Sequence, residues 1–163
     1  DLDYLLIDMP PGTGDVQMGL ARMLPRTDLL IVTTPAVSAQ KVAIRAADMA
    51  RRSFLRVAGV IENMSHFTCE HGSRYPLFGE GGGATLANDI GAELLGQVPI
   101  ENAVAHGSDT GEPVALSGAS AAAEVFRDIA KKIISATVPV TEMAGCSARL
   151  LESVEVALRK KPN

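Results

Sequence analysis

Tryptophan is absent from this 163-residue sequence, and aromatic residues make up only 4% of it. Because 47% of the residues are nevertheless hydrophobic, we expect a core built from aliphatic side chains. No uninterrupted apolar run approaches the roughly 18 residues that a membrane-spanning helix needs. The first residues also lack the pattern of a secretory signal peptide. The length and composition therefore predict a single soluble domain.

Cysteine and basic residues are also scarce. Cys69 and Cys146 are the only cysteines, which is too few for a disulfide framework and favours a reducing, cytoplasmic location. The 15 Lys and Arg residues are outnumbered by 19 Asp and Glu residues, and the net charge is −4. Nucleic-acid binding requires clustered basic side chains. We therefore expect no nucleic-acid partner.

Short apolar runs alternate with segments of helical periodicity along the chain. Continuous apolar runs of this kind are typical of buried parallel strands. We expect strands at 4–7, 28–34, 56–62 and 94–98, and helices at 16–24, 38–52, 83–90, after Pro99 and at 120–136. Such alternation predicts an α/β domain with a parallel sheet. Residues 63–82 are expected to form a long loop that ends in a glycine-rich hinge.

The first expected strand ends in Asp8 and is followed at once by Pro10-Pro11-Gly12-Thr13-Gly14-Asp15. This arrangement would place a carboxylate at the carboxyl edge of a parallel sheet, where ligands bind in such folds. An acid in that position can hold the water shell of Mg²⁺ beside a triphosphate. The backbone N–H of a following glycine can face the γ-phosphate. The opening segment is therefore a candidate nucleotide site.

The segment Ile7-Asp8-Met9-Pro10-Pro11-Gly12-Thr13-Gly14-Asp15-Val16-Gln17 resembles the Walker B and switch II signature of the Mrp (ApbC-like) ATPases. These are iron–sulfur cluster carriers related to MinD and ParA. Further matches follow in family order at 62–65, 78–83, 95–99 and 109–113, so that the resemblance extends from about Asp3 to about Ile134. It implies a parallel-sheet P-loop NTPase fold of the MinD type.

The resemblance also implies roles for individual residues. Asp8 would orient Mg²⁺ through water and Gly12 would sense the γ-phosphate of ATP, which makes these two the expected catalytic residues. Asn63, Pro99 and Ile100 would contact the adenine. An alternative for Asn63 is a turn residue that satisfies its own backbone. Asp15 would either bond across a dimer or cap the helix that begins at Val16.

The phosphate-binding loop of the family, G-x-x-x-x-G-K-[ST], does not occur in this sequence. We therefore interpret residues 1–138 as the C-terminal portion of an ATPase domain that is truncated at its N-terminus. Such a portion would lack a central strand and expose unpaired sheet edges. ATP hydrolysis is expected of the full-length parent, whereas the isolated chain is expected to bind ATP poorly.

The segment around Cys69 departs from the family. Mrp proteins commonly carry a C-x-x-C pair here, and two subunits together hold one [4Fe–4S] cluster. Cys69 has no second cysteine nearby, although four thiolates are the usual requirement for such a cluster. Cys69 is thus a tentative cluster ligand, with His66 and His71 as neighbouring alternatives. The other interpretation is that all three are unpaired surface residues.

Residues 139–163 are expected to form a separate tail. Leu150, Leu151, Val154 and Leu158 recur at helical spacing and predict an amphipathic helix. Because Glu152 and Glu155 interrupt its basic residues and no aromatic residue is present, docking on a membrane is disfavoured. Packing on the domain or on a partner is the favoured interpretation.

The combined hypothesis is an ATP-binding and ATP-hydrolysing iron–sulfur cluster carrier. The resemblance implies ATP, Mg²⁺ and a [4Fe–4S] cluster as ligands, a homodimer, and apo iron–sulfur proteins as cluster acceptors. Two alternatives stay open. One is a MinD/ParA-like switch that dimerises with ATP and holds no cluster. The other is a non-enzymatic interaction module.

Overall fold

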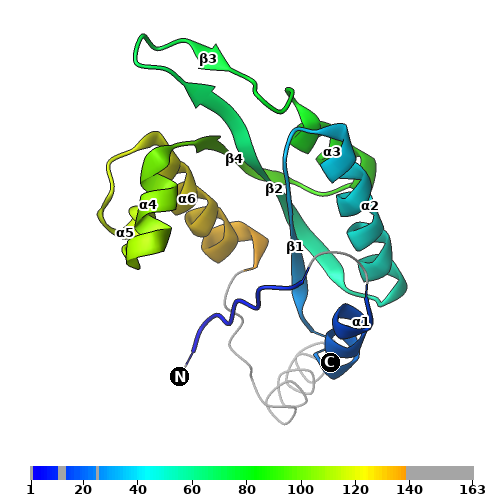
Figure 1. The fold of residues 1–163 in the computed structure, drawn as a ribbon. Helices are drawn as coiled ribbons and strands as arrows, with labels where there is room; N and C mark the ends of the chain where they lie inside the picture. The colour runs from blue at the N-terminus through cyan, green and yellow to red at the C-terminus, as the bar shows by residue number, and fades with distance from the viewer. Residues whose placement is uncertain (1, 11–13, 25, 139–163) are drawn as a thin grey trace, which may run out of the picture.

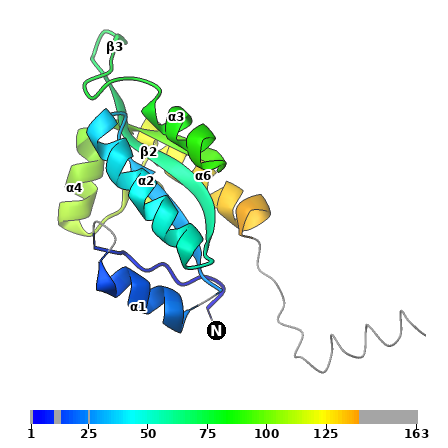
Figure 2. The ribbon, with the colours of Figure 1, turned by 90° about the vertical axis from the view of Figure 1, so that its right-hand side faces the viewer.

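A four-stranded sheet lies between two layers of helices in the computed structural model, which describes residues 2–10, 14–24 and 26–138 (Figures 1 and 2). The strands are β1 (Asp28–Thr33), β2 (Arg56–Thr68), β3 (Arg74–Tyr75) and β4 (Leu94–Ile100). The central strand β2 pairs in parallel with β1 and β4, and in antiparallel fashion with β3. The predicted α/β class with a parallel sheet is thus confirmed.

The helices are α1 (Asp15–Met23), α2 (Val37–Arg52), α3 (Gly82–Ile90), α4 (Asn102–Thr110), α5 (Val114–Ser117) and α6 (Ala121–Lys132), followed by the π-helical turn η1 (Ile133–Thr137). Helices α2 and α3 cover one face of the sheet, and α6 covers the other with α4 and α5 beside it (Figure 1). The strands and helices expected after residue 15 are confirmed within a few residues of their predicted bounds, except at the end of β2.

Two aliphatic clusters fill the space on either side of the sheet. The first joins β1 and β2 to α2 and α3, and consists of Ile31, Ala43, Ala47, Val60, Leu86, Ala87 and Ile90. The second joins β4 to α6, and consists of Leu95, Val98, Ala122 and Ile129. The buried members of both clusters are aliphatic, as the composition predicts, and one aromatic side chain, Phe126, packs against the second cluster. Small alanines let the helices approach the strands closely.

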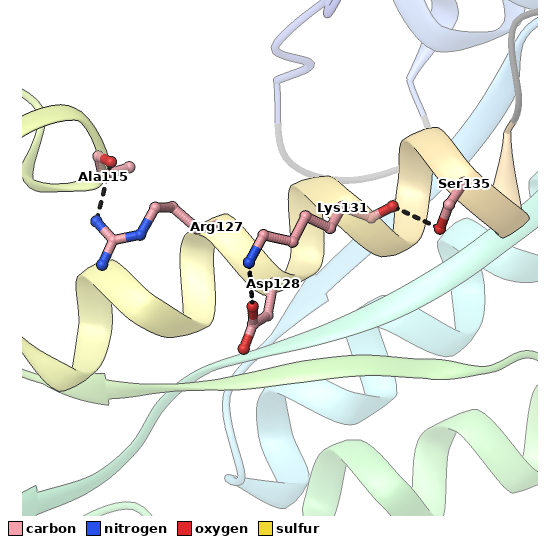
Figure 3. Close-up of polar contacts among 5 residues, drawn as sticks. All are labelled: Ala115, Arg127, Asp128, Lys131 and Ser135. Carbon is pink, nitrogen blue, oxygen red and sulfur yellow. Dashed lines mark hydrogen bonds and ion pairs between the residues drawn. The ribbon is translucent and has the colours of Figure 1, made fainter.

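Polar contacts hold α6 against the preceding turn. Ser120 caps the helix by accepting a hydrogen bond from the backbone N–H of Ala123 at 3.3 Å. The guanidinium of Arg127 donates to the carbonyl oxygens of Ala115 and Gly118, at 3.2 and 2.9 Å. Figure 3 shows the hydrogen bond from Arg127 to the Ala115 carbonyl. It also shows the Lys131–Asp128 ion pair and the hydrogen bond from Ser135 to the Lys131 carbonyl. The α5–α6 connection is thereby fixed near the end of β4.

The strand expected at residues 4–7 is wrong. These residues have no regular secondary structure, and Leu5 and Leu6 are exposed. A strand is stable only when a neighbour satisfies its backbone groups, and no strand in the described ranges pairs with this segment. Tyr4 instead donates its hydroxyl hydrogen to the carbonyl oxygen of Val138 at 2.7 Å. An apolar run of this kind is typical of a strand, but it does not show whether a neighbouring strand is present to pair with it.

The loop expected at 63–82 is also wrong in part. Strand β2 continues to Thr68 and turns back through β3, so that a β-hairpin projects beyond the body of the domain (Figure 1). The glycines at the end of the segment are not a free hinge, because Gly82 and Gly83 are buried. A Cβ atom on Gly83 would lie 2.6 Å from the Cβ of Glu62. These glycines permit close packing instead.

Within the described ranges, no helix combines the length and the apolarity needed to cross a bilayer. The amphipathic helix predicted in the tail lies in 139–163, outside the described residues.

Candidate functional site

Pairing between β2 and β4 brings three of the predicted site residues close together. Asn63 on β2 is in register with Val98 on β4, and Pro99 and Ile100 follow directly. The register shifts after Asn63, where Met64 has a left-handed backbone (φ 56°), and pairing resumes between Phe67 and Ile100. Such a bulge re-aims the strand at a site edge. The predicted proximity of Asn63 and Pro99 follows from this pairing.

One end of the Asn63 side chain is hydrogen-bonded to the backbone of the next residue. Its Oδ1 accepts a hydrogen bond from the N–H of Met64 at 2.9 Å. This is the local satisfaction that the sequence left open as an alternative role. The Nδ2 group of the same carboxamide remains a donor. Asn63 can therefore offer a hydrogen bond to an acceptor on a ligand without giving up its bond to Met64.

A groove of about 400 Å³ lies beside this edge, between the hairpin, the end of β4 and the start of α6. Its walls include the buried Pro99 and the half-buried Ile100, together with polar groups of His66, Thr68 and Arg74. Apolar walls with a few convergent polar groups are typical of small-molecule sites. Asn63 is not part of the groove lining, so Pro99 and Ile100 are the predicted site residues that the groove contains.

Glu101 also lines the groove, and one of its carboxylate oxygens is engaged in a hydrogen bond. Its Oε1 accepts from the backbone N–H of Ala122 at 3.1 Å, in the first turn of α6. A carboxylate there complements the positive end of the helix dipole. Its Oε2 is buried and has no partner among the described residues. A ligand that carries an N–H or O–H donor would satisfy this atom.

His66 is oriented by a short chain of hydrogen bonds. The Ser65 hydroxyl donates to the carbonyl oxygen of Val98 at 3.1 Å, and the same hydroxyl lies 3.0 Å from His66 Nδ1. Because the single hydroxyl hydrogen points to Val98, Nδ1 must be the donor in the second bond. Neutral His66 therefore keeps its lone pair on Nε2. The His66 ring, which lines the groove, thus has Nε2 as its hydrogen-bond acceptor.

Glu62, next to Asn63, is the best-buried polar residue at this edge, with 1% of its surface exposed. Its carboxylate accepts from the Gly83 N–H at the start of α3 and, at 2.6 Å, from Gln97 Nε2 on β4. The three elements β2, α3 and β4 are thus tied together behind Asn63. Sequence reasoning assigned Glu62 no role, although an acid at the end of an apolar strand was the available signal.

Cys69 lies at the tip of the hairpin and is partly exposed. Its N–H donates to the Ser73 carbonyl at 3.0 Å, and its own carbonyl accepts from Gly72 at 2.9 Å, which closes a tight turn. The backbone N–H of His71 lowers the pKa of the thiol, and Ser73 and Tyr75 add to this against the opposing effect of burial. The lowered pKa raises the fraction of the thiolate, which is the form that binds metals.

Among the described residues, no hydrogen bond or ion pair joins the opening segment to this edge. Asp8 is exposed in an irregular segment, and Gly12 lies outside the described residues. The carbonyl of Pro10 accepts from Gln17 Nε2 at 2.6 Å, which fixes the segment against α1. Helix α1 begins at Asp15 itself, one residue before the predicted start. Asp15 therefore lies in the first helical turn and is not its N-cap residue.

Metal-binding capacity is limited in the part of the chain that the structure describes. No group of three or more His, Cys, Asp or Glu side chains gathers there. Within these residues, Cys69 is therefore not part of a complete metal site.

These features were compared with known proteins. A family model described as "ParA: NUBPL iron-transfer P-loop NTPase" matches residues 1–134. This chain belongs to that family. The resemblance to Mrp-type iron–sulfur proteins, inferred from the motifs around Asp8 and Asn63, is thereby confirmed.

Curated relatives of this P-loop NTPase are named iron–sulfur cluster carrier proteins. The relative from Mycobacterium bovis is 44% identical over 128 residues, which is 75% of this chain and 34% of the relative. The one from Saccharolobus solfataricus is 42% identical over 137 residues, which is 82% of this chain and 46% of the relative. The chain thus spans about a third to a half of the length of the curated relatives that it matches.

Solved structures support the fold. A nucleotide-binding protein of Archaeoglobus fulgidus in complex with ADP has 37% identity and a TM-score of 0.57. The match covers 68% of this chain and 46% of that one. The cell division protein MinD of Aquifex aeolicus has 22% identity and a TM-score of 0.53, over 72% of this chain and 48% of that one. The P-loop NTPase fold of the MinD type is therefore confirmed.

Proposed function

We propose that this chain is part of a nucleotide-binding iron–sulfur cluster carrier. The observation that carries the proposal is the partly exposed Cys69 thiol at the tip of a projecting hairpin, with its pKa lowered. A ligand so displayed can receive a cluster and present it to another protein. The names of the curated relatives support the same role.

The nucleotide end of the proposed site is the β2–β4 edge. Asn63 Nδ2 donates to an acceptor on the adenine ring, while Pro99 and Ile100 supply an apolar wall. The unpartnered Oε2 of Glu101 accepts from a donor on the ligand. Pro99, Ile100 and Glu101 line the same groove, whereas Asn63 lies outside that lining, in register with Val98. Within the proposal, Asp8 and Gly12 serve the phosphates, with Asp8 orienting Mg²⁺ through water.

The iron–sulfur cluster is cargo in this scheme, and one chain does not hold it alone. Cys69 supplies one thiolate, and two copies of the chain supply two, whereas four ligands are usual for a [4Fe–4S] cluster. The proposal therefore requires a homodimer in which two hairpins meet. The remaining ligands are either His71, which lies in the same turn, or groups that do not belong to the described residues. Such a cluster, with few protein ligands, is suited to release.

Hydrolysis of ATP is proposed to control this release. In P-loop NTPases, hydrolysis depends on positioning and on charge stabilisation and needs no covalent intermediate. Glu62 can connect the two ends of the site because it directly precedes Asn63 in β2 and accepts a hydrogen bond from the first turn of α3. Helix α3 directly follows the segment that returns from the hairpin. A change at the nucleotide would thus reach the hairpin through one carboxylate.

A second candidate is a nucleotide-dependent dimerisation switch that carries no cluster. The presence of a single cysteine in the hairpin favours it. The two candidates differ in what the dimer contains and not in how it forms.

Anaerobic reconstitution tests the proposal. The protein, expressed from its complete coding sequence, is loaded with ferrous iron and sulfide, and then mixed with an apo iron–sulfur enzyme. Recovery of that enzyme's activity, with loss of cluster absorbance from the donor, is the expected result. Recovery no faster than with free iron and sulfide would contradict the carrier role.

A further inference from the structure

A second groove, of about 710 Å³, lies between α1, α2 and the turn that follows α2. Its lining combines apolar with basic side chains, namely Met18, Met49, Phe54, Arg22, Arg45 and Arg52. Methionine, arginine and aromatic residues are the types that are enriched where proteins bind one another. Because methionine is flexible, it adapts to apolar partners of different shape. The composition of the groove therefore indicates a surface for another protein.

The groove is locally basic, although the whole chain carries a net charge of −4. Arg22, Arg45 and Arg52 are exposed, and across residues 2–10, 14–24 and 26–138 none of them has an ion-pair or hydrogen-bond partner. Asp48, an acid in the lining, lies 3.6 Å from Arg51 and is paired with it. Arginine side chains bind carboxylates through paired, charge-assisted hydrogen bonds. The charge that complements this groove is therefore negative.

Phe54 lines the groove in a conformation that is unfavourable for an aromatic residue. Its side chain is 94% exposed, and its backbone has a positive φ of 58°. Its N–H donates to the Arg51 carbonyl at 3.1 Å, and the N–H of Leu55 donates to the Ala50 carbonyl at 2.9 Å. Glycine is the usual residue in such a helix-ending turn, because a Cβ atom is strained at positive φ. Since a phenylalanine here does not stabilise the isolated chain, it points to contact with a partner.

The groove and the hairpin lie at opposite ends of β2. Phe54 precedes the first residue of this strand, Arg56, and Cys69 follows the last, Thr68. A strand of 13 residues spans roughly 40 Å. Figure 1 likewise shows α1 and the hairpin at opposite ends of the sheet. A protein bound in the groove therefore leaves the tip of the hairpin exposed.

We propose that the groove between α1 and α2 binds an acidic amphipathic helix of another protein. Apolar side chains of that helix pack on Met18, Met49 and Phe54, and the carboxylates beside them bind the arginines. Residues three and four apart on a helix are neighbours, so a helix presents apolar and acidic side chains next to each other. This binding requires neither a nucleotide nor a cluster, and it is therefore independent of the carrier role.

Fluorescence anisotropy with designed peptides tests the proposal on the full chain. The probe is a labelled peptide with leucines at helical spacing and glutamates beside them, and the control peptide has glutamine in place of every glutamate. At physiological salt the glutamate peptide should bind at least about tenfold more tightly than the glutamine peptide. Equal binding of the two peptides, or no binding of the glutamate peptide, would overturn the proposal.

A matched pair of charge reversals locates the bound peptide. Arg45→Glu reverses a charge in the groove and should weaken binding of the glutamate peptide by about tenfold or more. Lys131→Glu makes the same change in charge on α6, across the sheet, at a side chain that is 76% exposed. Because salt screens distant charges, this variant should bind within about twofold of the unmodified protein. Equal effects of the two reversals would contradict binding in the groove.

Phe54→Gly separates binding from folding. Glycine relieves the strain at positive φ and removes no buried side chain, so the unfolding temperature should stay the same or rise. Binding of the glutamate peptide should nevertheless weaken by about tenfold or more, because aromatic anchors dominate the affinity of protein interfaces. Unchanged binding by this variant would overturn the proposed contact.

Other occupants of the groove would give different results. Tighter binding of single-stranded DNA or of phosphatidylglycerol vesicles than of the glutamate peptide would assign the groove to a nucleic acid or to a membrane. Concentration-dependent dimerisation that Arg45→Glu abolishes would assign it to a second copy of the chain. Each of these three results would overturn the proposal.

Discussion

The carboxylate of Glu62 accepts a hydrogen bond from the backbone N–H of Gly83, and this contact ties the end of β2 to the first turn of α3. It is possible only because residue 83 has no side chain. A Cβ atom there would lie 2.6 Å from the Cβ of Glu62 and 2.8 Å from its Oε2. Both residues belong to segments that the sequence linked to the family, but the contact itself became apparent only in the structure.

Gly83→Ala is therefore expected to destabilise the domain by about 1–3 kcal/mol, because the new methyl group has no room. The measurement is the free energy of unfolding from urea titration. Gly19→Ala is the matched control, since a Cβ on this helical residue would meet nothing within 4 Å. That variant should be neutral or stabilising by about 0.5–1 kcal/mol. Equal destabilisation by both variants would contradict the packing described here.

Substitutions of Glu62 separate its charge from its hydrogen bonds. Glu62→Leu leaves the buried N–H of Gly83 without an acceptor and should lower the free energy of unfolding by about 1–3 kcal/mol. Glu62→Gln keeps an oxygen for Gly83 and should cost less. The two variants are compared in the same urea titration. A Gln variant as unstable as the Leu variant would show that the negative charge is the essential feature.

The Cys69 thiol is expected to ionise at lower pH in the folded protein than in the unfolded chain. Its lowered pKa means that folding favours the thiolate, so this group adds stability as the pH rises through the folded pKa, and that contribution is lost as the pH falls. The measurement is the rate of alkylation by iodoacetamide against pH, in a Cys146→Ser background. The midpoint should lie lower without urea than with it.

Ser73→Ala provides the matched variant for this titration. The Ser73 side chain is one of the groups that lower the Cys69 pKa, so its removal should shift the midpoint part of the way upward. Coincident midpoints for the folded and the urea-unfolded protein would contradict the electrostatics of the hairpin turn.

Asn63 can be tested in the protein expressed from its complete coding sequence. Asn63→Ala removes the Nδ2 donor and should weaken ATP binding by roughly three- to tenfold, as expected for one hydrogen bond. Isothermal titration calorimetry gives the affinity directly. Asn102→Ala, at an exposed position on α4, serves as the control. Unchanged affinity in the Asn63 variant would remove this residue from the nucleotide site.

The sequence predicted correctly that β2 and β4 are strands of one parallel sheet, because continuous apolar runs are typical of buried parallel strands. The family resemblance implied that Asn63 lies beside Pro99, and the register of Asn63 with Val98 brings the two residues close, although β2 continues beyond Asn63 to Thr68. The apolar pattern failed for residues 4–7, because it signals a strand but does not show whether a neighbouring strand is there to pair with it. The hairpin was missed for a related reason. The polar residues at its tip are typical of a loop, and nothing in the sequence indicates that Phe67 pairs with Tyr75.

The central claim is that Cys69 holds an iron–sulfur cluster. The most direct test measures iron and acid-labile sulfide per dimer after anaerobic reconstitution of the protein expressed from its complete coding sequence. The account predicts that Cys69→Ser abolishes both, whereas Cys146→Ser retains them. Equal iron and sulfide in the Cys69→Ser variant and the unmodified protein, or none in either, would contradict the claim.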